Sequence, residues 1–150
     1  MLQASATCSA TLLVTTAGTT VTIALLLGRL LTCANVGDSE AVLDTGCSIL
    51  PLTHSHRLQT NLQEQARLKK AGCEVAPYGF HLQGPAKPDE QGVGPLRVWP
   101  SGLCVSRSIG DSDAGPEVVP MPHVKQVRRA QGAGLGALAG QIGERCHSFS

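Results

Sequence analysis

Gly-Pro-Leu-Arg-Val-Trp-Pro-Ser-Gly-Leu-Cys-Val-Ser-Arg-Ser-Ile-Gly-Asp, residues 94–111, is the stretch that least resembles generic globular sequence. It contains Trp99, the only tryptophan of the 150-residue chain. An apolar segment that runs directly into Arg107 and Asp111 predicts a buried strand or turn that brings charges to one place, because charges at a buried edge must be paired. The purely structural alternative is an ion pair between Arg107 and Asp111 that closes a turn.

The composition around this stretch predicts one turn-rich domain. A chain of 150 residues is long enough for a single core. Seventeen glycines, nine prolines and only four aromatic residues predict a core of Leu, Val, Ile and Ala with low stability. A net charge of +1 provides no overall field that would attract nucleic acid or an anionic membrane.

The cysteines indicate a reducing compartment. They are widely spaced, form no Cys-x-x-Cys pair and mostly have apolar neighbours, which predicts free thiols in an intracellular protein of the cytoplasm or nucleus. The N-terminus lacks the basic region of a secretory signal. The apolar run Val21–Ala34 is too short and too interrupted to span a bilayer, so we expect no membrane partner.

Apolar runs punctuated by glycine predict four strands in the first third of the chain. Residues 18–27 and 30–36 are rich in β-branched and aliphatic residues, and Gly28-Arg29 between them predicts a hairpin turn. After Asn35–Ser39, residues 40–44 predict a third strand and residues 47–52 a fourth.

One helix is predicted after these strands. Asn61 is a typical N-cap, and Glu64 three residues later completes the pattern of a capping box. Lys69 and Lys70 suit the negative end of the helix dipole, and Gly72 suits the position after the helix end.

The second half of the chain predicts shorter strands and a long loop. Residues 73–76 predict a strand, and the Gly- and Pro-rich residues 77–95 predict a surface excursion. Two further short strands are expected at Val118-Val119 and at residues 124–127.

Three polar residues raise the question of metal binding. Asp38 lies at a tight junction between strands, where an aspartate either forms an Asx-turn or binds a metal. His54 and His56 could both reach one metal only from a strand or an open loop. No matching Cys or His pair follows at zinc spacing, which argues against zinc.

Two further motifs have simple structural explanations. Asp44-Thr45-Gly46 resembles the loop of retroviral-type aspartic proteases, but the surrounding order differs and a hairpin turn explains it. Gly132-x-Gly134-x-x-Ala137 fits a relaxed dinucleotide fingerprint without the acidic residue about 20 positions further on. Gly/Ala-rich composition explains this second match.

Several motifs together resemble the metal-dependent protein serine/threonine phosphatases of type 2C, in the order found in that family. They are Gly18-Thr-Thr, Ala34-Asn-Val-Gly-Asp-Ser39, Leu52-Thr with His56, Glu64-x-x-Arg67, Ala71-Gly72-x-x-Val75, Ser106-Arg-Ser-Ile-Gly-Asp111 and the segment 116–127. The Gly-Pro-Leu-Arg-x-Trp-Pro form at residues 94–100 is most similar to plant and green-algal members.

This resemblance implies an α+β fold, namely part of an α/β/β/α sandwich of antiparallel sheets. We expect residues 18–129 to form an incomplete, central fragment of the phosphatase domain. Residues 1–17 stay unassigned, and the Gly/Ala-rich residues 130–150 are expected to be an unrelated, disordered tail.

The resemblance also implies a chemistry. Family members hold two Mg²⁺ or Mn²⁺ ions that activate a water for attack on phosphoserine or phosphothreonine, so phosphoproteins or kinases are the expected partners. Asp38 corresponds to an accessory metal ligand, and no residue is predicted to be catalytic. Six residues fall in motifs near the active site, namely Gly37, Ser39, Ser106, Arg107, Gly110 and Asp111.

Most primary metal-ligand motifs of the family have no counterpart in these 150 residues. Two-metal hydrolysis needs several carboxylates at once, so we expect a phosphatase by descent that is inactive alone. The alternative from another class is a non-catalytic module that binds kinases or phosphoproteins.

Overall fold

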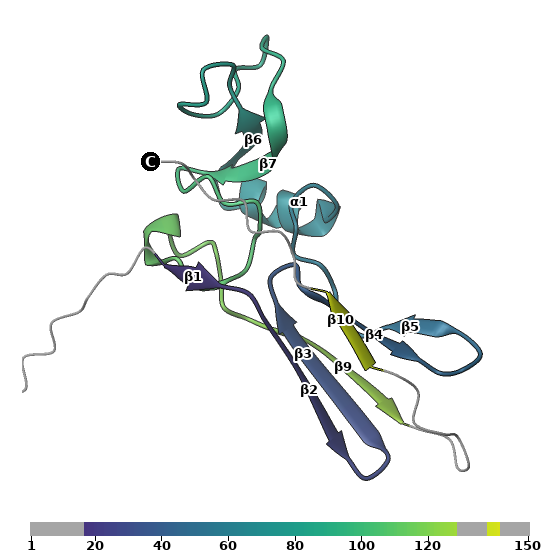
Figure 1. Cartoon of the computed structure of the whole chain (residues 1–150). Helices are drawn as coiled ribbons and strands as arrows, with labels where there is room; N and C mark the ends of the chain where they lie inside the picture. The colour runs from purple at the N-terminus through teal and green to yellow at the C-terminus, as the bar shows by residue number, and fades with distance from the viewer. Residues whose placement is uncertain (1–16, 129–137, 142–150) are drawn as a thin grey trace, which may run out of the picture.

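The computed structural model describes residues 17–128 and 138–141. In these residues the chain forms four antiparallel sheets, one α-helix and one 3-10 turn (Figure 1). The elements are β1 (Gly18–Thr19), β2 (Val21–Leu27), β3 (Leu30–Val36), β4 (Glu40–Asp44), β5 (Ile49–Pro51), α1 (Leu62–Lys70), β6 (Glu74–Tyr78), β7 (Val93–Trp99), β8 (Ile109–Gly110), η1 (Ser112–Ala114), β9 (His123–Arg128) and β10 (Leu138–Gln141).

The predicted hairpin is confirmed as β2 and β3. All seven residues of β2 pair with β3, from Val21 opposite Val36 to Leu27 opposite Leu30. Gly28 has a φ of +57° in the turn between them, a conformation that glycine adopts at low cost. The strand β9 pairs with the other side of β3 and completes a sheet in the order β2-β3-β9. Its range confirms the strand predicted at residues 124–127.

A second sheet has the order β10-β4-β5. The third predicted strand is confirmed as β4, whereas β5 is shorter than the predicted residues 47–52. The reason is that Asp44–Ser48 forms the hairpin turn, closed by a hydrogen bond from the Thr45 N–H to the Ser48 carbonyl at 2.9 Å. β10 lies within residues 130–150, the predicted tail, and pairs antiparallel with β4.

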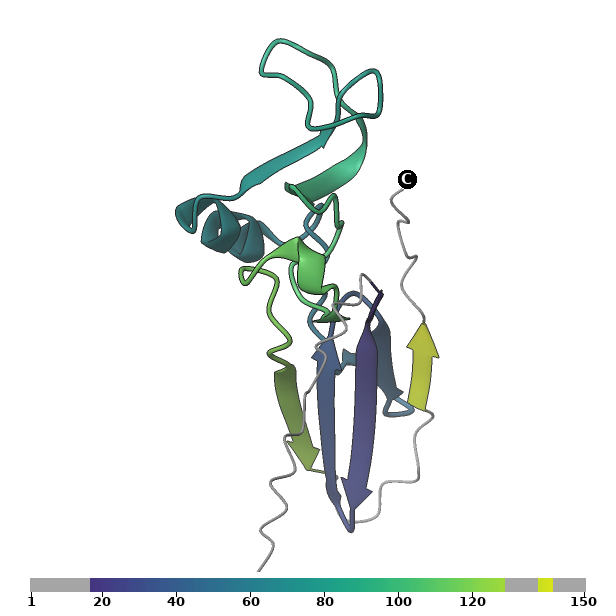
Figure 2. The same cartoon turned by 90° about the vertical axis from the view of Figure 1, so that its left-hand side faces the viewer.

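The two three-stranded sheets share a small core. The sheet cluster consists of Leu31 and Cys33 on β3, Ala41 on β4 and Leu52 just after β5, with Leu43, Leu50 and Val127 packed against them. Side chains on one face of β3 and β9 therefore pack against the β4–β5 hairpin. Figure 2 shows β9, β3 and β2 side by side in this order.

A second core lies at the other end of the molecule, where α1 packs near the β6–β7 hairpin (Figure 1). The helix cluster consists of Leu58, Leu68, Val98, Ala114 and Val118, all less than 9% exposed. The predicted helix is confirmed, because the Asn61 Oδ1 accepts a hydrogen bond from the Glu64 N–H at 3.0 Å and Gly72 has a φ of +90°.

The remaining elements depart from prediction in detail. β6 runs past the predicted end at residue 76, through Pro77 to Tyr78, and residues 79–92 form the loop to β7. The strand predicted at Val118-Val119 is wrong, because Gly115 and Pro116 turn the chain there and Val118 packs into the helix cluster instead.

The described residues therefore confirm an α+β fold of mostly antiparallel sheet with one helix. Within this described part, no helix is long and apolar enough to cross a membrane.

Candidate functional site

The turn between β3 and β4 holds Gly37, Asp38 and Ser39, three of the predicted site residues. Gly37 has a φ of +96°, and a Cβ at this position would lie 2.2 Å from the Thr20 Cγ2. A larger residue would therefore strain the turn and collide with Thr20, just before β2. The Ser39 hydroxyl bonds the Thr20 hydroxyl at 2.8 Å, which ties the turn to the start of β2.

Asp38 forms an ion pair with Arg57. The Arg57 Nη1 lies 3.0 Å from the Asp38 Oδ2, and the Asp38 side chain is only 5% exposed. The carboxylate is therefore paired in the described structure, and its role as an accessory metal ligand stays a prediction. A buried carboxylate needs a positive partner because water no longer solvates it, and Arg57 provides that partner.

His56 lies beside the same turn and is fully buried. Its Nδ1 lies 3.1 Å from the Gly37 nitrogen and 3.0 Å from the Gly37 oxygen, while its Nε2 has no hydrogen-bond partner in the described residues. Burial, and then the positive charge of Arg107, lower the pKa of His56 to about 4. The imidazole is therefore neutral at physiological pH. His56 contacts Gly37 in the turn through its ring and Ser106 through its carbonyl.

Glu64 is the charged centre of the site. Its carboxylate accepts hydrogen bonds from the Arg107 Nη2 at 2.7 Å and from the Arg67 Nη2 at 2.9 Å. Burial alone would raise the pKa of Glu64, but hydrogen bonds from Arg107, Arg67 and Ser106 lower it to about 2. The carboxylate is therefore ionised at physiological pH and pairs with two arginines at once.

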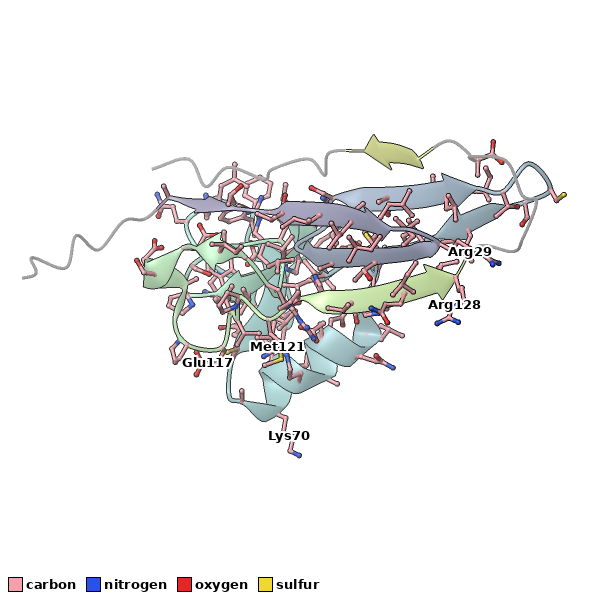
Figure 3. All side chains as sticks on the ribbon, turned by 90° about the horizontal axis from the view of Figure 1, so that it is seen from below. Arg29, Lys70, Glu117, Met121 and Arg128 are labelled. Carbon is pink, nitrogen blue, oxygen red and sulfur yellow. The ribbon has the colours of Figure 1, made fainter. Side chains whose placement is uncertain are left out.

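The two arginines also fix the segment after β8. Arg67 donates to the Glu117 carbonyl at 2.9 Å, and Arg107 donates to the Met121 carbonyl at 3.0 Å. Figure 3 shows Glu117 and Met121 beside the helix. The helix, residues 106–107 and residues 117–121 are thus held together through Glu64.

Of the remaining predicted site residues, Ser106 lies beside His56, whereas Gly110 and Asp111 lie beside β1. Ser106 is fully buried and donates to the His56 carbonyl through both its N–H at 2.9 Å and its hydroxyl at 3.2 Å. Gly110 and Asp111 instead lie beside β1, where a Cβ at Gly18 would collide with the Asp111 carboxylate. Gly37, His56, Ser106 and the arginine after it therefore form one connected group, and Asp111 lies outside it.

The alternative ion pair between Arg107 and Asp111 is wrong, because the guanidinium of Arg107 pairs with Glu64. Gly110 and Asp111 both have positive φ, at +91° and +47°, and this turn places the Asp111 carboxylate against Gly18. The more deeply buried carboxylate has the greater need for a counter-charge.

The rings of the two predicted histidines lie apart from each other. The rings of His54 and His56 lie 6.2 Å apart at 72°, and the His54 Nε2 already contacts the Asn61 amide at 3.0 Å. Across residues 17–128 and 138–141, no group of three or more His, Cys, Asp or Glu side chains is arranged to hold a metal ion.

Of the protease-like motif at residues 44–46 and the dinucleotide-like motif at residues 132–137, only the first lies in the described part of the chain. Asp44-Thr45-Gly46 forms the β4–β5 turn, in which the Asp44 Oδ1 accepts a hydrogen bond from the Gly46 N–H at 2.8 Å. The hairpin-turn interpretation is confirmed. The Gly132–Ala137 motif lies outside the described residues.

Arg57 and Glu64 are central to the site but are not among the residues that the sequence predicts for it. Glu64 and Arg67 are spaced i, i+3 on a helix, which indicates their mutual ion pair. The contact of Glu64 with Arg107 joins residues 43 positions apart, and no local pattern signals it.

The fold and this arginine-rich site define a class, an α+β domain of antiparallel sheets with a connected polar group at the β3–β4 turn. The family model described as "Protein phosphatase 2C" matches residues 2–138. The chain therefore belongs to the protein phosphatase 2C family. The match extends beyond the predicted domain of residues 18–129 at both ends.

The similar curated proteins are plant phosphatases. The chain is 46% identical over 120 residues to "Probable protein phosphatase 2C 5" of Arabidopsis thaliana, covering 79% of the chain and 26% of that protein. It is 48% identical over 118 residues to "Probable protein phosphatase 2C 33" of rice (Oryza sativa subsp. japonica), covering 78% and 26%. The chain spans about a quarter of the length of these relatives, and its plant-like character is confirmed.

A solved structure supports the fold. The chain resembles the "Structure of a C.elegans sex determining protein" with a TM-score of 0.61 and 23% sequence identity, over 77% of this chain and 25% of that one.

Proposed function

We propose that this chain is the scaffold part of a phosphoserine/phosphothreonine phosphatase domain, and that these 150 residues do not hydrolyse phosphoproteins alone. In this proposal the two three-stranded sheets belong to the inner layers of an α/β/β/α sandwich. Membership of the protein phosphatase 2C family supports a protein phosphatase with phosphoprotein substrates. The ion pair between Asp38 and Arg57 is the observation that carries the proposed inactivity.

The family is generally dependent on Mg²⁺ or Mn²⁺, and the described residues do not fit such a centre. A hard divalent ion needs several carboxylate or water oxygens around it. Asp38, the one predicted ligand, already accepts a charged hydrogen bond from Arg57. Glu64 is likewise held by two arginines. A metal at Asp38 would therefore compete with Arg57 for a carboxylate whose charge is already balanced.

A phosphate-release assay on a phosphothreonine peptide tests the proposal. The purified 150-residue chain with Mn²⁺ is expected to release no more phosphate than the same chain in EDTA, while an active phosphatase of the family serves as positive control. Asp38→Ala and Asp44→Ala form a matched pair, because Asp44 lies in the β4–β5 turn, where it bonds Gly46. Metal-dependent turnover that Asp38→Ala abolishes and Asp44→Ala preserves would overturn the proposal.

The second candidate is a non-catalytic module that binds phosphoproteins or kinases. Two separate apolar clusters within the described residues favour it, because the fold is held together without a metal centre. Binding of a phosphoprotein without turnover, measured by calorimetry, would support this second function.

We also propose an intracellular location in the cytoplasm or nucleus. Cys33, Cys47 and Cys73 are free thiols in the described part of the chain, as expected in a reducing compartment. Microscopy of the tagged chain tests this location.

A further inference from the structure

The ion pair of Asp38 and Arg57 is separate from the arginine pairs of Glu64. The Arg57 Nη1 lies 3.0 Å from the Asp38 Oδ2, and the side chain of Arg57 is 27% exposed and that of Asp38 5%. Glu64, the other buried carboxylate of the described residues, is shared by Arg67 and Arg107. Each of the two buried carboxylates therefore has its own cationic partners.

The residues that precede Asp38 and Arg57 hold the two backbones together. The His56 N–H donates to the Gly37 carbonyl at 3.1 Å, and the His56 Nδ1 lies 3.1 Å from the Gly37 nitrogen. Because residues 37 and 56 directly precede residues 38 and 57, these contacts place the two charged side chains beside each other. An ion pair whose backbones are already fixed loses less side-chain entropy when it forms than a pair of free surface residues.

The backbone of Arg57 is also fixed on its C-terminal side. Its carbonyl accepts hydrogen bonds from the N–H of Thr60 at 3.2 Å and from the N–H of Asn61, the helix cap, at 3.0 Å. Leu58, the next residue, is fully buried in the helix cluster and donates its N–H to the Cys104 carbonyl at 2.9 Å. Arg57 is therefore part of the junction between the two cores.

The surroundings of Asp38 suit a guanidinium better than a divalent cation. Mg²⁺ takes about six oxygen ligands in a nearly octahedral arrangement. In the part of the chain that the structure describes, no three His, Cys, Asp or Glu side chains are grouped to supply them. A guanidinium needs only hydrogen-bond acceptors, stays charged at physiological pH and matches the geometry of a carboxylate.

We propose that Arg57 is a resident cation at Asp38, which takes the place of the accessory metal and keeps Mg²⁺ or Mn²⁺ from this carboxylate. This role deepens the proposed function and rests on it for the metal expected at Asp38. A divalent cation reaches the carboxylate only after the guanidinium has moved away, because two cations beside one carboxylate repel each other. Arg57 therefore sets the affinity of Asp38 for divalent metal in this chain.

Paramagnetic broadening of backbone amide NMR signals by Mn²⁺, in the isotope-labelled 150-residue chain, tests this role. The method detects weak binding and does not depend on turnover. In the native chain, the signals of residues 37–39 are expected to broaden no more than those of the buried helix cluster. Arg57→Gln should raise the broadening at residues 37–39 at least about tenfold, because it removes the competing charge from a buried carboxylate. Adding Asp38→Asn to this variant should abolish the increase.

Arg128→Gln is the matched control, because it removes the same charge at a distance from Asp38. Arg128 is exposed at the end of β9 and pairs with the start of β3, whereas Asp38 follows the end of β3. Broadening at residues 37–39 should therefore stay at the native level in this variant. Asp89, an exposed carboxylate in the loop between β6 and β7, serves as the internal standard. The signals around it should broaden equally in all variants.

Arg57→Lys provides a second variant should Arg57→Gln fail to fold. It keeps a positive charge but loses the planar fork of the guanidinium, so broadening at residues 37–39 should lie between the native value and that of Arg57→Gln.

Three outcomes would overturn the proposal. They are native broadening at residues 37–39 as strong as that in the Arg57 variants, no increase in either Arg57 variant, and an equal increase in Arg128→Gln. Failure of the proposed function is a separate result, because it is seen as phosphate release in the peptide assay. The role of Arg57 is decided by Mn²⁺ binding alone.

Discussion

Glu64 shows how one buried carboxylate organises groups from distant parts of the chain. It is 6% exposed, and it binds Arg67 from its own helix and Arg107 from the segment before β8. Each guanidinium has a second partner in a backbone carbonyl, which fixes its position. The carboxylate also departs from the capping-box pattern, because it turns to these arginines and the Asn61 N–H instead bonds the Arg57 carbonyl at 3.0 Å.

Glu64→Ala is expected to destabilise the chain by about 3 kcal/mol, because it leaves two guanidinium groups together with no counter-charge. Urea denaturation followed by tryptophan fluorescence measures the change. Glu74→Ala on the exposed side of β6 is the control and should cost less than about 0.5 kcal/mol. Equal effects of the two substitutions would show that the arginine pairs contribute nothing specific.

At the scale of elements, helix α1 is joined to the site through its N-cap. Asn61 is 6% exposed and uses both ends of its amide. Its oxygen caps the helix at the Glu64 N–H, and its Nδ2 donates to the Ser55 carbonyl at 2.8 Å. The cap therefore anchors the segment of the two histidines to the first turn of the helix.

Asn61→Ala should destabilise the chain by about 2 kcal/mol, more than the roughly 1 kcal/mol of an ordinary cap, because a bond to Ser55 is lost as well. Asn61→Ser provides the comparison, since a serine hydroxyl still caps the helix but does not reach Ser55. Urea unfolding of both variants should rank serine between alanine and the native residue. A serine variant as unstable as the alanine one would mean that the capping bond has no measurable effect.

Local patterns predict the elements of this chain better than its site. The hairpin of β2 and β3 and the helix followed from glycine punctuation and capping residues, which act within a few positions. β5 came out shorter because the turn after Asp44 uses residues that are also compatible with a strand. The pairs Asp38–Arg57 and Glu64–Arg107 join positions 19 and 43 residues apart, and only the folded backbone brings them together.

At the scale of the whole molecule, the site lies between two small cores. The sheet cluster lies beyond the β3–β4 turn, and the helix cluster lies around α1 and β7. The segment 54–57 and Ser106 bridge them, through the bond from the His56 N–H to the Gly37 carbonyl at 3.1 Å and the bonds of Ser106 to His56. Loss of these hydrogen bonds should uncouple the two cores. The protonation state of the His56 imidazole should therefore affect the stability of the fold.

Stability should therefore fall in two stages as the pH is lowered. The pKa of His56 is lowered in the fold to about 4, so unfolded chains bind a proton below pH 6.5 while the fold does not. This contribution is complete above pH 6.5 and is lost as the pH falls to about 4, at a cost on the order of 3 kcal/mol. The pKa of Glu64 is lowered to about 2, so its contribution is lost between about pH 4.5 and 2.

Urea unfolding at a series of pH values measures both stages. Arg107, Glu64 and His54 face His56, and we expect the His56 stage to occur at higher pH than the Glu64 stage in their presence. His56→Gln should flatten the slope between pH 6.5 and 4 and leave the lower stage in place, whereas Glu64→Gln should do the reverse. If the first variant fails to fold, NMR titration of His56 in the native chain reports the same quantity, because a buried neutral ring must keep its shifts down to about pH 4. A ring that titrates near 6.5 would show that the bridge between the two cores is open to water, and the first stage should then be absent from the unfolding curves as well.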